Sequence, residues 1–155
     1  MKKREEGGFH YDRNRFRPRR VRPERSTSRP YRPPLRGITC QDFGCETPDR
    51  CDYPVFGKAA AQAVASGQCE KGIVICTTGI GISISANKVK GIRCALWGIP
   101  FAEMCRRHNN ANMLAMGAGI VGPNLAERMV DVFLSTEFDG GRHTKRVELM
   151  MEIEG

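Results

Sequence analysis

A cysteine separates a run of apolar residues from a glycine-bearing loop in the segment Ile75-Cys76-Thr77-Thr78-Gly79-Ile80-Gly81. Glycines at a strand-to-helix turn let backbone N–H groups face outward, and a helix N-terminus adds partial positive charge. Such a loop suits an anion, either a phosphate or an enediolate oxygen, and it favours the ionised form of a thiol. Cys76 is therefore a candidate for a base that transfers protons. A small buried residue at the end of a strand is the alternative interpretation.

Two other groups of polar residues could bind or act on a ligand. The run His108-Asn109-Asn110-Ala111-Asn112 ends an expected helix and precedes an expected strand, so we expect it at the same ligand-binding edge as Cys76. A histidine that caps the helix would give the same pattern. Arg142 and Arg146 are four residues apart and share one helix face, and guanidinium groups suit phosphate oxygens. A solvated basic face is the alternative for this pair.

The elements that must position these residues alternate between short apolar strands and helices. We expect strands over 39–43, 72–76, 93–96 and 113–116, and helices over 54–66, 82–88, 101–109, 124–134 and from about residue 142. The apolar run over 72–76 is typical of a strand that is buried on both faces of a parallel sheet. This order predicts an α/β fold with a three-layer, doubly wound, Rossmann-like parallel sheet. Ligands bind such sheets at the carboxyl ends of the strands, here after Cys76, Leu96 and Met116.

The net charge of +8 comes from the first part of the chain. Residues 1–37 hold 13 of the 25 Lys and Arg residues and carry a net charge of +9, whereas the rest of the chain is at −1. This leader is rich in arginine and proline and has no apolar period, so we expect it to be disordered. Residues 38–155 would then form one α/β domain. Nucleic-acid binding by the leader is disfavoured, because it has no Arg-Gly-Gly repeat and the domain has no basic patch to support it.

Targeting signals and cysteine spacing narrow the class of protein further. No apolar run approaches the about 20 residues that a bilayer span requires, and no signal peptide is recognisable. The seven cysteines lack the paired spacing of zinc sites and disulfide frameworks. We therefore expect a cytoplasmic protein with reduced thiols, no membrane partner and no bound metal.

Further motifs accompany those of the candidate site in a fixed order along the chain. They are Asp42-Phe43-Gly44, Cys51-Asp52-Tyr53-Pro54, Ala65-Ser66-Gly67, the strand over 72–76, Thr78-Gly79-Ile80-Gly81-Ile82-Ser83, Ala86-Asn87-Lys88, Gly91-Ile92-Arg93, the run over 108–112, Asp131, Phe138, and Gly140-Gly141-Arg142-His143 with Arg146. From Gln41 to Glu148 this ordered set resembles the ribose-5-phosphate isomerase B family, which includes the galactose-6-phosphate isomerase subunits. No single motif is decisive, but the set is specific.

The resemblance implies an aldose–ketose isomerase of a phosphorylated sugar, an intramolecular oxidoreductase that uses no metal or organic cofactor. Ribose 5-phosphate, converted to ribulose 5-phosphate in the pentose phosphate pathway, is the expected substrate. Allose 6-phosphate and galactose 6-phosphate are the alternatives. The resemblance also implies a homodimer or a larger homo-oligomer whose active sites are shared between subunits.

The family pattern assigns a role to each matching residue. Cys76 would move the proton between C1 and C2, and Thr78 and His108 would assist ring opening by general acid–base transfer. The remaining roles are substrate binding: the backbone amides of Thr77, Gly79, Ile80 and Gly81 on the enediolate oxygens, Tyr53 and Asn109 on the sugar, and Arg142 and Arg146 on the phosphate.

The sequence departs from the family pattern within the site. Thr77 stands where a glycine usually follows the catalytic cysteine, and its Cβ narrows the conformations open to the loop. Gly119 stands where the family has an arginine, which removes one expected phosphate ligand. The stretch over 97–101 is one residue short. A catalytically impaired protein is therefore an alternative to an active isomerase.

The largest departure lies at the N-terminus, where the family opens with a strand that runs into an Asp-His pair of the active site. Residues 1–37 show no such strand or pair, so we expect the sheet to lack its first strand. If the reading frame over residues 11–25 is displaced by one nucleotide, the codons permit the sequence Met-Ile-Ala-Ile-Gly-Ser-Asp-His-Ala-Gly-Tyr-Asp-Leu-Lys-Glu. This sequence matches the N-terminal strand and Asp-His pair of the family. We hypothesise that residues up to about Arg36 are translated in a shifted frame and that the true frame resumes by Cys40.

Overall fold

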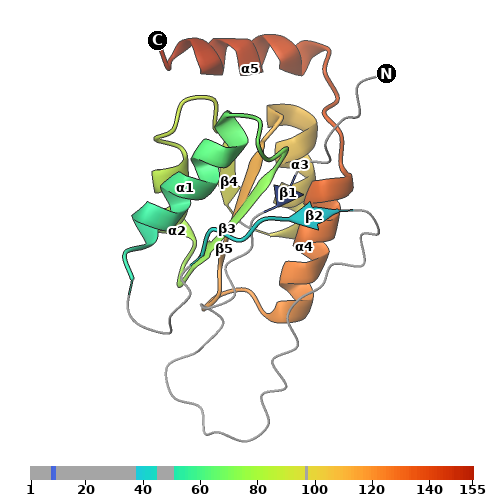
Figure 1. The fold of residues 1–155 in the computed structure, drawn as a ribbon. Helices are drawn as coiled ribbons and strands as arrows, with labels where there is room; N and C mark the ends of the chain where they lie inside the picture. The colour runs from blue at the N-terminus through green and yellow to red at the C-terminus, as the bar shows by residue number, and fades with distance from the viewer. Residues whose placement is uncertain (1–7, 10–37, 45–50, 97) are drawn as a thin grey trace, which may run out of the picture.

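Strands and helices alternate along the chain in a computed structural model that describes residues 8–9, 38–44, 51–96 and 98–155 (Figure 1). The strands are β1 (Gly8–Phe9), β2 (Thr39–Cys40), β3 (Gly72–Cys76), β4 (Cys94–Leu96) and β5 (Met113–Gly117). The helices are α1 (Tyr53–Ala65), α2 (Ile80–Ala86), α3 (Ile99–Asn109), α4 (Pro123–Ser135) and α5 (Arg142–Glu152).

The central sheet is parallel and has the strand order β3-β5-β4. β5 pairs with both neighbours, so that Gly72 and Cys94 both lie opposite Met113. β1 and β2 form a separate parallel pair. Parallel pairing brings the carboxyl ends of β3, β4 and β5 to one edge of the sheet, and the expected α/β fold with a parallel sheet is confirmed.

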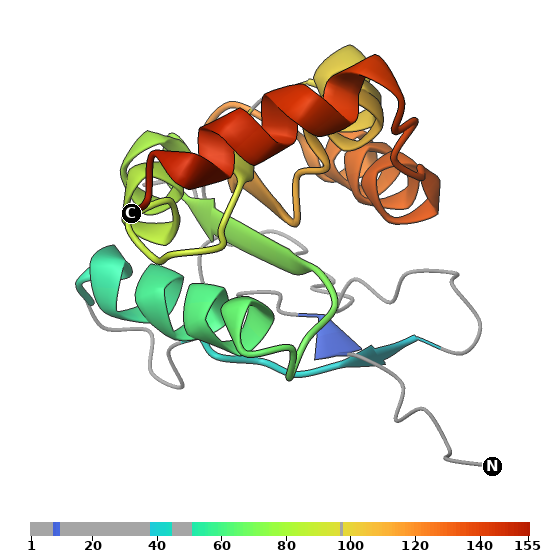
Figure 2. The same cartoon turned by 90° about the horizontal axis from the view of Figure 1, so that it is seen from above.

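Alternate residues of the central strands face two different helix layers. Ile73, Ile75, Leu114 and Met116 belong to a buried cluster with residues of α3 and α4. Val74, Cys76, Met113 and Ala115 belong to a second cluster with residues of α1 and α2. Burial on both faces explains why these strands are continuous apolar runs in the sequence. Figure 2 shows the resulting three layers, with the sheet between the two helix pairs.

The first strands differ from expectation in length. β2 is limited to Thr39–Cys40, shorter than the expected strand over 39–43. Gly8–Phe9 form β1, which pairs with β2 and not with the central sheet, so it does not supply the first strand that we expect the sheet to lack. β3 ends the central sheet, and within the described ranges no strand pairs with its outer edge. The rest of the leader and the proposed frame shift over residues 11–25 lie outside the described residues.

Both helices on the second face of the sheet have proline in their first turn, and each begins earlier than expected. α4 begins at Pro123 and α3 begins one residue before Pro100. Proline is tolerated at the start of a helix, where its missing N–H would have no partner inside the helix. These prolines therefore mark the beginnings of the helices that cover the second face of the sheet.

Candidate active site

The loop after β3 holds the thiol of Cys76 with a backbone donor. The N–H of Gly79 donates a hydrogen bond to Cys76 Sγ at 3.1 Å, and the cysteine is buried in the second cluster. Gly79 makes this bond in the left-handed region, with φ of 81°, which glycine adopts without a steric penalty. The sulfur is thus held in place by a backbone group of its own loop.

The end of β5 and the loop that follows it pack backbone against backbone on the Cys76 loop. A Cβ on Gly79 would lie 2.8 Å from Met116 C, and a Cβ on Gly117 would lie 2.6 Å from Thr78 C. Two hydrogen bonds join the loops, from Ala118 N to Cys76 O at 2.8 Å and from Gly119 N to Thr77 O at 2.9 Å. The loop is therefore fixed before any ligand binds. Gly117 is a site residue that the sequence did not single out, although its position at the end of a buried strand was a usable signal.

Tyr53 brings a polar aromatic side chain to the same edge of the sheet. It begins α1, and its ring lies so close to Gly81 that a Cβ on that glycine would overlap the ring atoms. Tyr53 remains more than one-third exposed, at 37 %. The structure thus brings Tyr53 together with the loop that carries Cys76, Thr77, Thr78 and Gly79.

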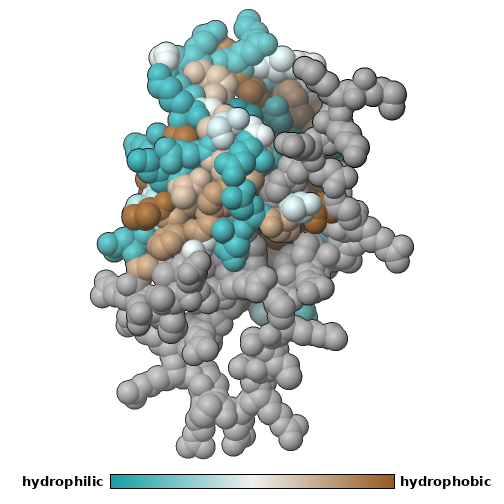
Figure 3. Space-filling view, viewed as in Figure 1, coloured by the Kyte–Doolittle hydropathy of each residue, from teal (hydrophilic) through white to brown (hydrophobic). Residues whose placement is uncertain are grey.

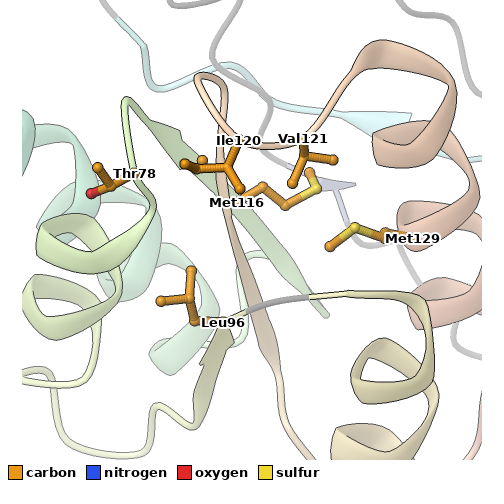
Figure 4. Close-up of a pocket in the computed structure, with 7 residues that line it drawn as sticks. Thr78, Leu96, Met116, Ile120, Val121 and Met129 are labelled. Atoms are coloured by element: carbon orange, nitrogen blue, oxygen red, sulfur yellow. The ribbon is translucent and has the colours of Figure 1, made fainter.

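A small hollow opens where the three central strands end (Figure 4). It is lined by Thr78, Leu96, Met116, Gly117, Ile120, Val121 and Met129. Thr78 supplies the one polar side chain of this lining. None of the residues that line this hollow is basic. The lining therefore provides no cationic side chain to bind a phosphate group.

The second group of predicted site residues lies at the opposite edge of the sheet. His108 and Asn109 end α3, and β5 begins shortly afterwards at Met113. A helix that ends just before a parallel strand lies at the amino end of that strand, whereas Cys76 lies at a carboxyl end. The expectation that His108 and Asn109 share an edge with Cys76 is therefore wrong within one chain. Figure 1 shows that α5 also lies on this side of the molecule, past the amino ends of the central strands.

An aromatic contact joins the end of α3 to the start of α5. The rings of His108 and His143 are stacked, with centroids 4.3 Å apart and planes 6° from parallel. His143 is the one buried residue of α5, all of which lies in the described part of the chain. Arg142 Nε approaches His143 Nε2 at 3.5 Å, so this guanidinium, too, lies beside the stack.

Charge surrounds the stacked rings. Burial lowers the pKa of His143, and the positive charges of His108, Arg142 and Arg146 lower it further. Asp139 opposes this effect and is itself paired with Arg107 through contacts of 3.1 Å. The predicted phosphate-binding arginines thus share a cationic cluster with His108. His143 lies in the motif Gly140-Gly141-Arg142-His143, but the sequence assigned it no role. Its position next to Arg142 was the sequence signal that could have marked it as a site residue.

Metal ligands and membrane helices are not found in the part of the chain that the structure describes. No group of three His, Cys, Asp or Glu side chains is arranged there to hold a metal ion. No described helix combines the length and apolar character needed to cross a membrane.

Comparison with known proteins adds independent information. The model of the Ribose/Galactose Isomerase family matches residues 34–150. Ribose-5-phosphate isomerase B of Escherichia coli is 45% identical over 120 residues, which cover 77% of this chain and 80% of that protein. The galactose-6-phosphate isomerase subunit LacB of Clostridium acetobutylicum is 43% identical over 113 residues, covering 72% of this chain and 65% of that protein. The solved structure of Clostridium thermocellum ribose-5-phosphate isomerase B superposes with a TM-score of 0.75 at 52% identity, covering 77% of this chain and 81% of that chain.

Proposed function

Because the chain belongs to the ribose/galactose isomerase family and is a sugar-phosphate isomerase, we propose that its substrate is ribose 5-phosphate and its product ribulose 5-phosphate. The match to this chain covers about four-fifths of each of the two named ribose-5-phosphate isomerases. These two relatives support ribose 5-phosphate as the substrate. The reaction is an intramolecular oxidation and reduction, since C2 is oxidised while C1 is reduced.

The hydrogen bond from Gly79 to Cys76 is the single observation that carries the proposed mechanism. The thiolate removes the proton from C2, the electron pair of that bond forms the C1–C2 double bond of an enediolate, and the π pair of the C1 carbonyl moves onto O1. The proton then returns from sulfur to C1, and the hydroxyl proton of O2 is transferred to O1, which leaves a ketone at C2 and a hydroxyl at C1. Backbone N–H groups of Thr77, Ile80 and Gly81 bind the developing negative charge on the oxygens, a task that fixed donors perform without reorganisation. The N–H of Gly79 is engaged by Cys76 Sγ.

Ring opening and phosphate binding require the residues at the other edge of the sheet. Thr78 lies beside Cys76, but His108, Asn109, Arg142 and Arg146 do not. We propose that a second copy of the chain supplies these four residues and that the protein is a homodimer or a larger homo-oligomer. In a two-fold symmetric dimer each copy would complete the site of the other, which gives two whole sites.

Exposed apolar side chains support association between copies. α5 exposes Leu149 and Met150, and Ile153, directly after this helix, is exposed at 85 %. α1 and α2 expose Val55, Ile80 and Ile84, and Figure 3 shows apolar surface among polar residues over these two helices. Apolar residues gathered on helix faces are typical of surfaces that another protein covers.

Galactose 6-phosphate is the second candidate substrate. The LacB relative supports it, and so does the absence of a side chain at Gly119. Gly119 donates its N–H to Thr77 O, so it lies directly beside the loop that would hold the sugar. A sugar with one more carbon needs additional room at such a place.

A coupled assay of ribose 5-phosphate conversion tests the proposed function. Cys76→Ser should lower kcat by about 100-fold or more, the usual contribution of general acid–base catalysis. Cys69→Ser is the matched control, because Cys69 is buried in the same cluster but lies before β3. Equal activity of the two variants would contradict the role of Cys76. Conversion of galactose 6-phosphate alone would select the second substrate.

The proposed frame shift in the leader is tested with a separate variant in the same assay. We propose that residues 1–37 lie outside the α/β domain of residues 38–155 and that residues 11–25 reflect a shifted reading frame. Replacing residues 11–25 with the shifted-frame sequence should raise activity, because it supplies a strand and an Asp-His pair. Activity only in the replaced chain would support the frame shift. Equal activity in both chains would contradict it.

A further inference from the structure

The stacked rings of His108 and His143 form a unit within one chain. His108 ends α3, and His143 lies in the first turn of α5, with Arg142 beside it and Arg146 one turn further. If a second copy delivers His108 to the Cys76 loop, it delivers His143 at the same time. The inference below rests on the proposed function, since it takes His108 as the residue that transfers the ring-opening proton.

A parallel stack constrains an imidazole in a specific way. At 4.3 Å between centroids and 6° between planes, one ring covers a face of the other. Such a contact resists rotation of the covered ring but leaves both of its nitrogens at the edge, where they can exchange protons. A hydrogen bond to a nitrogen would instead occupy one of the atoms that the reaction needs.

Burial and the surrounding positive charges oppose protonation of His143 and lower its pKa. Two positively charged rings at this distance repel each other, and Arg142, Arg146 and Arg107 add positive charge on the same side of the molecule. Asp139 is the acidic group that faces both histidines, and it is already paired with Arg107. Burial of His143 acts in the same direction as the arginines, because a charged ring would lose its hydration.

We propose that His143 is a positioning residue for His108, whose imidazole it holds by stacking in the orientation that transfers the ring-opening proton. The contact is made by the ring and not by its charge. A flat, uncharged ring at position 143 should therefore replace histidine, whereas an apolar side chain without a ring should not.

Two variants of the full chain separate these properties. His143→Phe keeps a flat ring, and His143→Leu keeps an apolar side chain without one. In the proton NMR spectrum of the histidine-labelled chain, the ring protons of His108 should stay close to their original shift in the Phe variant. They should move downfield in the Leu variant, because the shielding by the neighbouring ring is lost. Thermal unfolding of both variants shows whether each is folded.

Kinetics on ribose 5-phosphate supply the second measurement. His143→Leu should lower kcat about 10-fold or more with little change in KM, as expected for a misplaced proton donor. His143→Phe should keep most of the activity. A rise in KM of equal size in both variants, with kcat unchanged, would overturn the inference and make His143 a ligand of the phosphate.

The two measurements also separate this inference from the proposed function. If His108 does not move in the Leu variant, the stack does not exist in solution and the inference is overturned, whatever the kinetics show. If His108 moves but the unmodified chain converts no ribose 5-phosphate, the stack stands. The proposed substrate is then the part that fails.

Discussion

At the scale of single residues, the thiol of Cys76 is held by the backbone of its own loop. The N–H of Gly79 points at Sγ, and the loop in turn rests on the backbone of Met116 and Gly117. A backbone donor cannot rotate away as a side chain can, so the site is organised before substrate binds. The cost is a dependence on glycine, because any larger residue at position 79 meets backbone atoms.

Gly79→Ala should therefore destabilise the protein strongly. Alanine at a φ of 81° costs about 1 to 2 kcal/mol in conformational energy. The clash with Met116 C and Gly117 N adds to this, so we expect a total loss of more than about 3 kcal/mol in the free energy of unfolding. Gly67→Ala is the control, with a φ of 78° and no atom within 4 Å of the added Cβ. Urea denaturation curves that shift equally for both variants would contradict the proposed contact between the loops.

His143 should also give the stability of the protein a pH dependence. Its pKa in the folded chain lies below the usual 6.5 because of burial and neighbouring positive charge. As the pH falls through 6.5, His143 becomes protonated in the unfolded chain but not yet in the folded chain. Stability is thus complete above pH 6.5 and is lost as the pH falls towards the lowered pKa. In His143→Phe this part of the loss should disappear, which urea denaturation at a series of pH values would detect.

At the scale of elements, α5 is held mainly at its two ends. The stack of His143 on His108 fixes the beginning, and the loop before β4 fixes the end, where Gly91 N donates to Glu154 Oε2 at 2.7 Å. Arg93 joins both neighbouring helices: its guanidinium donates to Asn110 O at 2.8 Å and to Met151 Sδ at 3.2 Å. The middle of α5 is exposed, so its position depends on these few contacts.

Replacing Arg93 with methionine should loosen α5 and the end of α3 together. We expect a loss of about 1 to 2 kcal/mol in the free energy of unfolding, the value of charged hydrogen bonds to carbonyl oxygens that water can reach afterwards. Lys145→Met removes an exposed cation of α5 and should cost little. Hydrogen exchange should quicken in α5 of the Arg93 variant only. Unchanged exchange there would show that Arg93 does not anchor the helix.

At the scale of the whole molecule, the two halves of the predicted site lie at opposite edges of one sheet. Cys76, Thr78 and Tyr53 lie at the carboxyl edge, and His108 with Arg146 lies at the amino edge. No rearrangement of loops brings them together, because the strands themselves lie between. Association of two copies is the arrangement that makes the predicted site whole without unfolding either of them.

Mixing two inactive variants tests this arrangement. Cys76→Ser and Arg146→Met disable different halves of the site, and a hybrid dimer of the two would contain one site with neither change. Co-expression should give about a quarter of the unmodified activity, because half of a random population is hybrid and each hybrid has one whole site of two. If each chain carries its own complete site, every site in the mixture is defective and no activity returns.

The sequence by itself determined the elements and the loop chemistry, because both depend on neighbours in the chain. The buried run over 72–76 and the glycines after it specify a strand and a tight turn, and the structure has both. The opposite placement of His108 was also open to deduction, since a helix that ends before a parallel strand lies at its amino edge. Only the tertiary structure decided that His143 stacks on His108 and that Gly79 packs on Met116. These contacts join residues more than 30 positions apart, and their geometry depends on how the helices and strands pack rather than on any local pattern.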